Sequence, residues 1–378
     1  MEKAREAALQ VLHHNSHGPY QGLPRTAGWG YPEPYTRDWM IAALGVLASG
    51  NEQLIGVLGN LLSVLARGQT PHGHIPSLAH DPTDCGASDT TPLFLIALAL
   101  YRRVTGEKEF LEETVQKALL WMRYQSPDDS IMIAQQPTSD WRDEQWVLGY
   151  GLFVNVLQYA CLRLYGEKDR ADTLKALMNQ KSLRGEFDKK RIHEGLALPD
   201  EPYYALWVYK IHISKRFDLL GNSLAILFGL ADVANAGKTI DWVEAACDHL
   251  RAQGELASEL PPCLFPYIQP GDEDWLPRYK IYGQPGKYHN GGVWPFIAGF
   301  YVAASVGAGM QALAEKKLDA LTALVKPARS NDIAYGFNEW FCAQENQPCG
   351  QDWQTWSAAM YLYALHCVEE RKAVFFWE

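Results

Sequence analysis

Apolar residues recur every three to four positions through most of the chain, a spacing that predicts amphipathic helices. Alternation of the kind typical of strands is scarce. The segment at 219–235 is apolar on nearly all sides and is therefore expected inside the molecule. The predicted helices cover residues 2–14, 38–49, 52–67, 90–105, 108–124, 146–165, 168–182, 219–235, 239–252, 293–306, 309–326 and 353–369.

The connections between these twelve segments alternate between short and long. Each even-numbered helix is joined to the next by a short, plain stretch, such as SGN at 49–51 or ANAGK at 234–238. The loops before the even-numbered helices are long and rich in Gly, Pro, Asp, Trp and His. Short joins produce antiparallel helix pairs. The pattern therefore predicts an all-α fold, an (α/α)6 toroid of inner and outer helices, as one catalytic domain over residues 1–378.

Composition narrows the class of protein. Hydrophobic residues make up 47% of the chain, enough for a large core, and the net charge of −10 argues against nucleic acid or an anionic membrane as a partner. The seven cysteines form no CxxC pair and no Cys/His spacing of a metal site. No apolar run approaches the roughly 20 residues that span a bilayer, and the charged N-terminal segment has no apolar signal region. We expect a cytoplasmic protein with reduced thiols and no metal.

Aromatic residues concentrate in the long loops, for example in GWGYPEPY at 28–35 and FNEWF at 337–341. Aromatic rings in loops often contact ligands that have one apolar face, as sugar rings do. The alternative is that they only pack the loops onto the helices. Because a ring of hairpins brings these loops to one end, we expect the polar clusters within them to converge on an active site.

Two carboxyl groups are needed to hydrolyse a glycosidic bond: one protonates the leaving oxygen, and the other activates water or attacks the sugar. Asp140 and Asp143 flank Trp141, and Glu339 precedes Trp340. A carboxyl group beside an indole loses hydration, which raises its pKa. Asp143 and Glu339 are therefore the candidate catalytic pair, whereas helix capping is the alternative for Asp140, Asp143 and Asp89.

Other loop residues are candidates for binding the sugar. Asp38 could bind hydroxyl groups with Arg37 orienting it, or it could be a capping residue beside a surface arginine. His289 and Asn290 could contact substrate or form a hydrogen-bonded pair within their loop. Gln354 and Trp356 open the last helix, where they could line the site or belong to the core.

The motifs RDW, SDTTPLF, DWRD, FDLLGNSLAI, YHNGGVWP and WQTWSAA resemble the neutral/alkaline invertase family. They are also similar to the glucosidase domain of glycogen-debranching enzymes, and the resemblance runs from about residue 35 to 369. It implies an (α/α)6 toroid and an inverting reaction. It also implies that Glu339 is the base and that the acid lies in TSDWRDE at 138–144.

The debranching pattern places the acid at Asp143. In the invertases two basic residues follow the acid, whereas Glu144 and Gln145 follow Asp143, so Asp140 is the alternative and sucrose is not assured as the substrate. By resemblance, the subsite of the cleaved sugar includes Asp38, Asp89, His289, Asn290 and Gln354. The full set of expected substrate-binding residues is Arg37, Asp38, Trp39, Asp89, Asp140, Trp141, His289, Asn290, Trp294, Trp340, Gln354 and Trp356.

The sequence thus predicts an inverting hydrolase of a small α-glucoside or a sucrose-like carbohydrate, acting without a cofactor. A sugar epimerase or a phosphorolytic enzyme on the same toroid is the first alternative. An epimerase would pair His289 with a second histidine such as His72, His74 or His80. A non-catalytic sugar-binding protein is the other alternative. Assembly into a homo-oligomer is compatible with all three.

Overall fold

Six helices form a closed inner ring in the computed structural model, which describes residues 1–127, 131–180, 195–210 and 212–376. Each inner helix packs on the next one around the ring, and the last packs on the first, in the order α2, α4, α6, α8, α11, α13 and again α2. The inner helices are α2 (Thr36–Ser49), α4 (Thr90–Thr105), α6 (Leu152–Leu164), α8 (Leu219–Leu227), α11 (Pro295–Gly307) and α13 (Thr355–Glu370).

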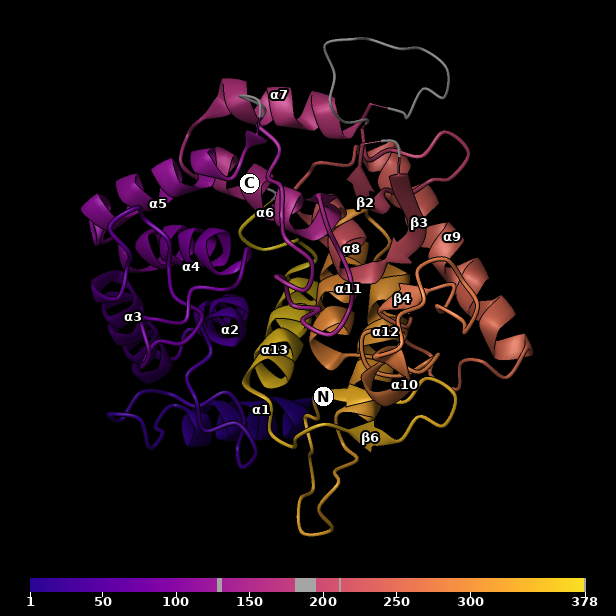
Figure 1. Cartoon of the computed structure of the whole chain (residues 1–378). Coiled ribbons are helices and arrows are strands. Elements are labelled where there is room, and N and C mark those ends of the chain that lie inside the picture. Colours follow the sequence, from indigo (N-terminus) through magenta and orange to yellow (C-terminus); the bar gives the residue numbers. More distant parts are fainter. Residues whose placement is uncertain (128–130, 181–194, 211, 377–378) are drawn as a thin grey trace.

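Six further helices surround this ring, as Figure 1 shows along its periphery. α1 packs on α13, α3 on α2 and α4, α5 on α4, α7 on α6, and α12 on α11 and α13. The outer helices are α1 (Glu2–Asn15), α3 (Glu52–Arg67), α5 (Glu112–Tyr124), α7 (Lys168–Met178), α9 (Val233–Ala252) and α12 (Gln311–Leu324). This arrangement is the (α/α)6 toroid, so the fold predicted from the sequence is confirmed.

The inner and outer helices differ in how many of their residues are buried. Every residue of α8 is buried, whereas the twenty residues of α9 include only five buried ones. The outer helix α9 is held to the rest by Glu244, which accepts a hydrogen bond from Tyr301 of α11 (2.8 Å) and pairs with the buried Lys317 of α12 (2.7 Å). An apolar surface on all sides thus predicts an inner helix, and a single apolar stripe predicts an outer one.

Several predicted boundaries were wrong. Residues 146–151 are not helical, and ANAGK at 234–238 lies inside α9 instead of between two helices. The turn comes earlier, at 228–232, because the Asp232 side chain accepts a hydrogen bond from the Asn235 backbone (2.8 Å) and caps α9. The end of the predicted helix 168–182 lies outside the described residues.

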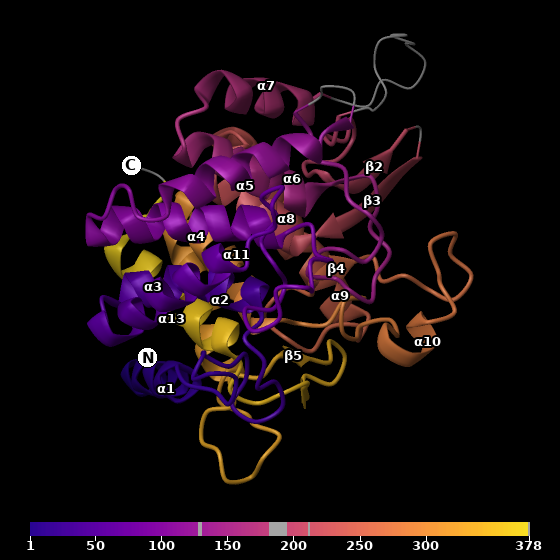
Figure 2. The same ribbon diagram turned by 60° about the vertical axis from the view of Figure 1, so that its left-hand side comes forward.

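Strands are few, as expected, but none of them was located from the sequence. A four-stranded antiparallel sheet in the order β1-β2-β3-β4 adjoins the ring, and a short two-stranded sheet follows α12. Figure 2 shows the β2–β3 hairpin on the same side of the ring as the short helix α10 (Tyr279–Tyr282). The strands are β1 (Tyr150–Gly151), β2 (Ala205–Tyr209), β3 (His212–Asp218), β4 (Leu264–Phe265), β5 (Trp340–Phe341) and β6 (Pro348–Cys349).

Candidate active site

Asp143 and Glu339 come from two long loops, the one before α6 and the one before α13. The Asp143 side chain is 60% exposed, whereas Glu339 is only 6% exposed. The two carboxyl groups lie in one electrostatic neighbourhood, because the charge of Asp143 raises the pKa of Glu339 and both charges act on the phenols of Tyr31 and Tyr288. The ring therefore brings these two acidic residues together at the N-terminal end of the inner helices.

Glu339 is held by the chain that leads into α13. Its carboxylate accepts a hydrogen bond from the Gln351 backbone N–H (3.2 Å), and its own N–H donates to the Gln351 carbonyl (3.0 Å). Gly350 lies directly against the carboxylate, since a Cβ atom there would be 2.2 Å from Glu339 Oε2. Gly350 also has a φ of +71°, which other residues adopt only with strain. Glycine is thus required at this position for the chain to approach Glu339.

Burial perturbs all three carboxyl groups at the centre of the cluster. Loss of hydration, with the charges of Asp38 and Asp143, raises the pKa of Glu339 to about 8. Burial raises the pKa of Asp38 to about 7 against the opposing charge of Arg37. Burial also raises the pKa of Asp143, again opposed by Arg37, although this side chain keeps contact with solvent. At neutral pH the cluster therefore holds a proton on Glu339.

Arg37 and Asp89 form a bidentate ion pair. Nε and one terminal nitrogen of Arg37 donate to the two oxygens of Asp89, at 2.6 and 3.1 Å. Asp89 is fully buried at the N-cap of α4, but its side chain makes no cap hydrogen bond because Arg37 occupies both oxygens. Asp89 therefore does not cap α4 with its side chain, and Arg37 occupies both oxygens that were expected to bind the sugar. Asp89 instead orients Arg37 toward the charges of Asp143 and Asp38.

Asp140 is held in a buried network of hydrogen bonds and ion pairs, and its charge acts on Asp143 and Asp89 in the cluster. It is 1% exposed, and its oxygens accept hydrogen bonds from Arg142 and from Gln135 (3.1 Å). Arg142 also pairs with Asp218 at the start of α8 (3.1 Å). Its bonds with Arg142 and Gln135 keep the Asp140 carboxylate ionised, with a lowered pKa. The buried triad fixes the loop that carries Asp143, and it leaves Asp140 no proton to donate.

Four of the predicted tryptophans and His289 belong to one connected aromatic cluster, whereas Trp39 does not. Trp141 contacts His289 and Trp294 edge-on, with ring centroids 5.1 and 5.4 Å apart. Trp294 in turn contacts Trp356 (6.0 Å). Tyr288 lies between His289 (3.9 Å) and Trp340 (5.7 Å). The buried indole nitrogens of Trp141 and Trp356 and Nδ1 of His289 have no hydrogen-bond partner within the described residues.

His289 approaches Asp143 without forming an ion pair. Nε2 of His289 is 3.9 Å from Asp143 Oδ1, beyond hydrogen-bond distance. Burial and the neighbouring charge of Arg142 lower the pKa of His289 well below its usual value, so the ring is neutral. Two of the three histidines that an epimerase could use as a partner are engaged elsewhere: His74 stacks on Trp121 of α5, and His80 packs on Tyr20. The third, His72, is exposed.

Three other predicted residues are buried within the protein framework. Trp39 is completely buried, and its indole donates to the Arg25 carbonyl (3.0 Å), so it offers no surface to a ligand. Asn290 bonds the backbone of Ile268 and Gly283, which is the loop-stabilising role considered above. Gln354 is 1% exposed at the N-cap of α13, and its side-chain oxygen has no partner in the described part of the chain.

Tyr31 and Tyr288 were not singled out from the sequence. Burial and the charges of Glu339, Asp38 and Asp143 raise the pKa of Tyr31 to about 12, and burial with the charges of Asp143 and Glu339 raises that of Tyr288 further. Both phenols therefore remain protonated and can donate hydrogen bonds beside the acidic pair. The only signal was their presence in GWGYPEPY and KYHNGG, among many loop tyrosines. No group of three His, Cys, Asp or Glu side chains in the described ranges is arranged to hold a metal.

Solved structures that share this toroid include glycoside hydrolases. A GH63 mannosylglycerate hydrolase from Thermus thermophilus is 16% identical, with a TM-score of 0.65 over 95% of this chain and 99% of that one. A wild-type glycosidase is 14% identical, with a TM-score of 0.63 over 96% and 95% of the two chains. At these identities the likeness concerns the fold.

Sequence comparison points to one family within that class. The family model described as alkaline and neutral invertase matches residues 197–371. Chloroplastic alkaline/neutral invertase E of Arabidopsis thaliana is 28% identical over 159 residues, which are 40% of this chain and 23% of that protein. Probable alkaline/neutral invertase F of the same plant is 27% identical over 166 residues, 43% and 31% of the two chains. The resemblance to the invertases is confirmed, and the match spans less than a third of these relatives.

Proposed function

We propose that the protein is an inverting glycoside hydrolase of a small α-glucoside or sucrose-like substrate. One observation carries this proposal. Asp143 and Glu339, from loops about 200 residues apart, belong with Asp38 to one cluster of three carboxyl groups whose pKa values are raised. The likeness to invertases and to a mannosylglycerate hydrolase supports a glycosidic substrate.

In the proposed reaction Asp143 protonates the glycosidic oxygen, and Glu339 accepts a proton from the water that attacks the anomeric carbon from the opposite face. The exposure of Asp143 suits a group that reaches the leaving side of the substrate, and the burial of Glu339 suits one that holds a water. Burial favours the protonated form of Glu339, so the proposed reaction requires that the substrate complex holds a proton on Asp143 and leaves Glu339 ionised.

Product analysis tests the reaction. Sucrose, trehalose, isomaltose and glucosylglycerate should be supplied in turn, with the product anomer followed by NMR. Inversion releases β-glucose first from an α-glucoside. With sucrose or glucosylglycerate, whose other product is not glucose, early release of α-glucose would reject inversion. An unchanged substrate mass with altered stereochemistry would indicate an epimerase, and binding without turnover would indicate a sugar-binding protein.

The two roles can be separated with α-glucosyl fluoride, whose leaving group needs no proton. Asp143→Asn should lose several orders of magnitude on a natural glucoside but retain turnover of the fluoride. Glu339→Ala should lose both and recover when azide replaces the activated water, giving β-glucosyl azide. Glu345→Gln, an exposed change in the neighbouring loop, is the matched control. Fluoride turnover retained by the Glu339 variant and lost by the Asp143 variant would reverse the assignment.

A further inference from the structure

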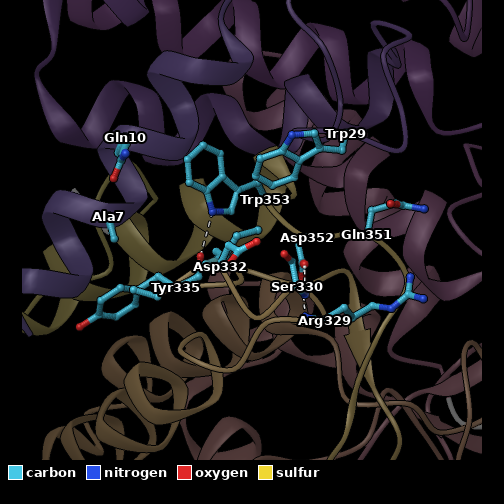
Figure 3. A pocket seen from close by; sticks show the side chains of 12 residues that line it. Ala7, Gln10, Trp29, Arg329, Ser330, Asp332, Tyr335, Gln351, Asp352 and Trp353 are labelled. Carbon is cyan, nitrogen blue, oxygen red and sulfur yellow. Dashed lines mark hydrogen bonds between the residues drawn. The ribbon is translucent and has the colours of Figure 1, made fainter.

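A cavity of about 730 Å³ shares a wall with the candidate active site. It lies between α1, the loop at 329–335 and residues 351–353, and we call it the α1 pocket (Figure 3). Gln351 lines it, while the backbone N–H of the same residue donates to the Glu339 carboxylate. The volume falls within the range of about 300–1,000 Å³ that is usual for small-molecule sites. None of the expected substrate-binding residues lines this pocket.

Two indoles form one wall of the α1 pocket. Trp29 and Trp353 lie side by side, with ring centroids 4.9 Å apart and planes tilted by 43° (Figure 3). His14 of α1 contacts both rings, with centroid distances of 5.7 Å to Trp29 and 5.1 Å to Trp353. Trp29 is 56% exposed, one of the most exposed large hydrophobic side chains in the described part of the chain. A partly exposed indole beside a hollow can stack on the apolar face of a sugar ring.

Trp353 is fixed in place before any ligand binds. Its indole donates to the Tyr335 carbonyl (2.9 Å), its backbone N–H donates to the Gly336 carbonyl (2.6 Å), and its own carbonyl accepts from Asn15 of α1 (2.7 Å). Its φ of +58° is unfavourable for a bulky residue and persists only because these contacts hold it. A wall ordered in advance costs a ligand little conformational entropy on binding.

Polar groups lie across from the indoles. Arg329 and Asp332 are exposed members of the 329–335 loop, and Figure 3 shows them below Trp29 and Trp353. The loop is anchored by Asp352, whose two oxygens accept hydrogen bonds from the backbone of Arg329 and of Ser330, each at 3.0 Å. An arginine and an aspartate provide donors and acceptors for hydroxyl groups without favouring a charged ligand.

We propose that the α1 pocket is a second carbohydrate-binding site, in which Trp29 stacks on a sugar ring while Arg329, Asp332 and Gln351 bind its hydroxyl groups. An aromatic wall facing polar groups of both charges is the chemistry that recognises a neutral, hydroxyl-rich ligand. This inference does not depend on hydrolysis by Asp143 and Glu339.

Calorimetric titration tests the site with maltotriose, isomaltotriose and sucrose as separate probes. The Glu339→Gln chain serves as the parent, so that no probe is consumed. Trp29→Ala in this parent should weaken binding of at least one probe about tenfold or more. Tyr124→Ala, which removes a similarly exposed ring at the end of α5 (62% exposed), should leave that affinity unchanged.

Two results would overturn the proposal: no binding of any probe, or equal affinity in the parent and in Trp29→Ala. Should Trp29→Ala fail to fold, Asp332→Ala replaces it, with the same expected weakening and the same refuting result. Absence of hydrolysis by the unmodified chain would reject the catalytic proposal without affecting the binding result. Failure of the catalytic proposal and failure of the second binding site are therefore distinguishable.

Discussion

Replacing Glu339 with glutamine should stabilise the folded protein at alkaline pH while it removes activity. The pKa of Glu339 is about 8 in the folded chain, against 4.5 for an ordinary glutamate. Between these two pH values the folded state keeps a proton that the unfolded chain releases, so stability falls as the pH rises. The penalty is complete above about pH 8 and absent below pH 4.5. Glutamine cannot ionise, and it avoids the penalty altogether.

The size of the effect follows from the same pKa. One pKa unit corresponds to about 1.4 kcal/mol, so the interval from 4.5 to about 8 sets an upper limit near 5 kcal/mol. The Gln351 N–H remains a donor to the new side-chain oxygen, and neighbouring groups relax around an ionised carboxylate. We therefore expect Glu339→Gln to raise the free energy of unfolding by about 1–3 kcal/mol at pH 8 and by close to zero at pH 5.

Urea unfolding at the two pH values measures this difference without any knowledge of the substrate. Glu345→Gln, the same change at an exposed position six residues later, should leave stability nearly equal at both. Two results would refute the electrostatic account of the cluster. One is a Glu339→Gln chain that is less stable than the parent at pH 8, and the other is a change in the free energy of unfolding that is equal at pH 5 and pH 8.

Three further outcomes are expected. Arg142→Met leaves Asp140 and Asp218 buried without their cation and should cost about 3–5 kcal/mol of stability in urea unfolding; a smaller loss would contradict the role of the triad. Gly350→Ala displaces the Glu339 carboxylate and should lower kcat about 100-fold, with helical content unchanged by circular dichroism; full activity would show that the contact is unimportant. The kcat/KM of the unmodified chain should fall about tenfold per pH unit above about pH 8, where the acidic cluster loses the proton that the general acid must donate, and a constant value to pH 10 would contradict this.

The ring could be predicted because its two kinds of helix differ in composition. Inner helices such as α8 are apolar on all sides, and plain turns alternate with elaborate loops. The β2–β3 hairpin was not predicted, because its alternation of apolar and polar residues is short and is followed directly by the apolar run of α8. A period of two over so few residues is a weaker signal than the helical periodicity of longer segments nearby.

The sequence singles out Asp143 and Glu339 as candidates, but it does not reveal the neighbours of each group. Asp140 and Asp143 flank the same tryptophan and look equivalent along the chain. Only the fold shows that the Arg142 side chain turns back onto Asp140 and reaches Asp218, some 75 residues later. Likewise, the first turn of α2 presents Asp38 to the cluster and Trp39 to the core, because adjacent helical residues point in different directions.

Closure of the toroid constrains how the chain can fold. α2 and α13 pack on each other although they lie near opposite ends of the described residues. During synthesis the apolar surface of α2 therefore stays uncovered by α13 until about 300 further residues have been made, and until then it is available for aggregation or for a chaperone. Glu339 and its supporting segment 350–351 precede α13, so a nascent chain lacking α13 has both carboxylates but no closed ring to hold them together.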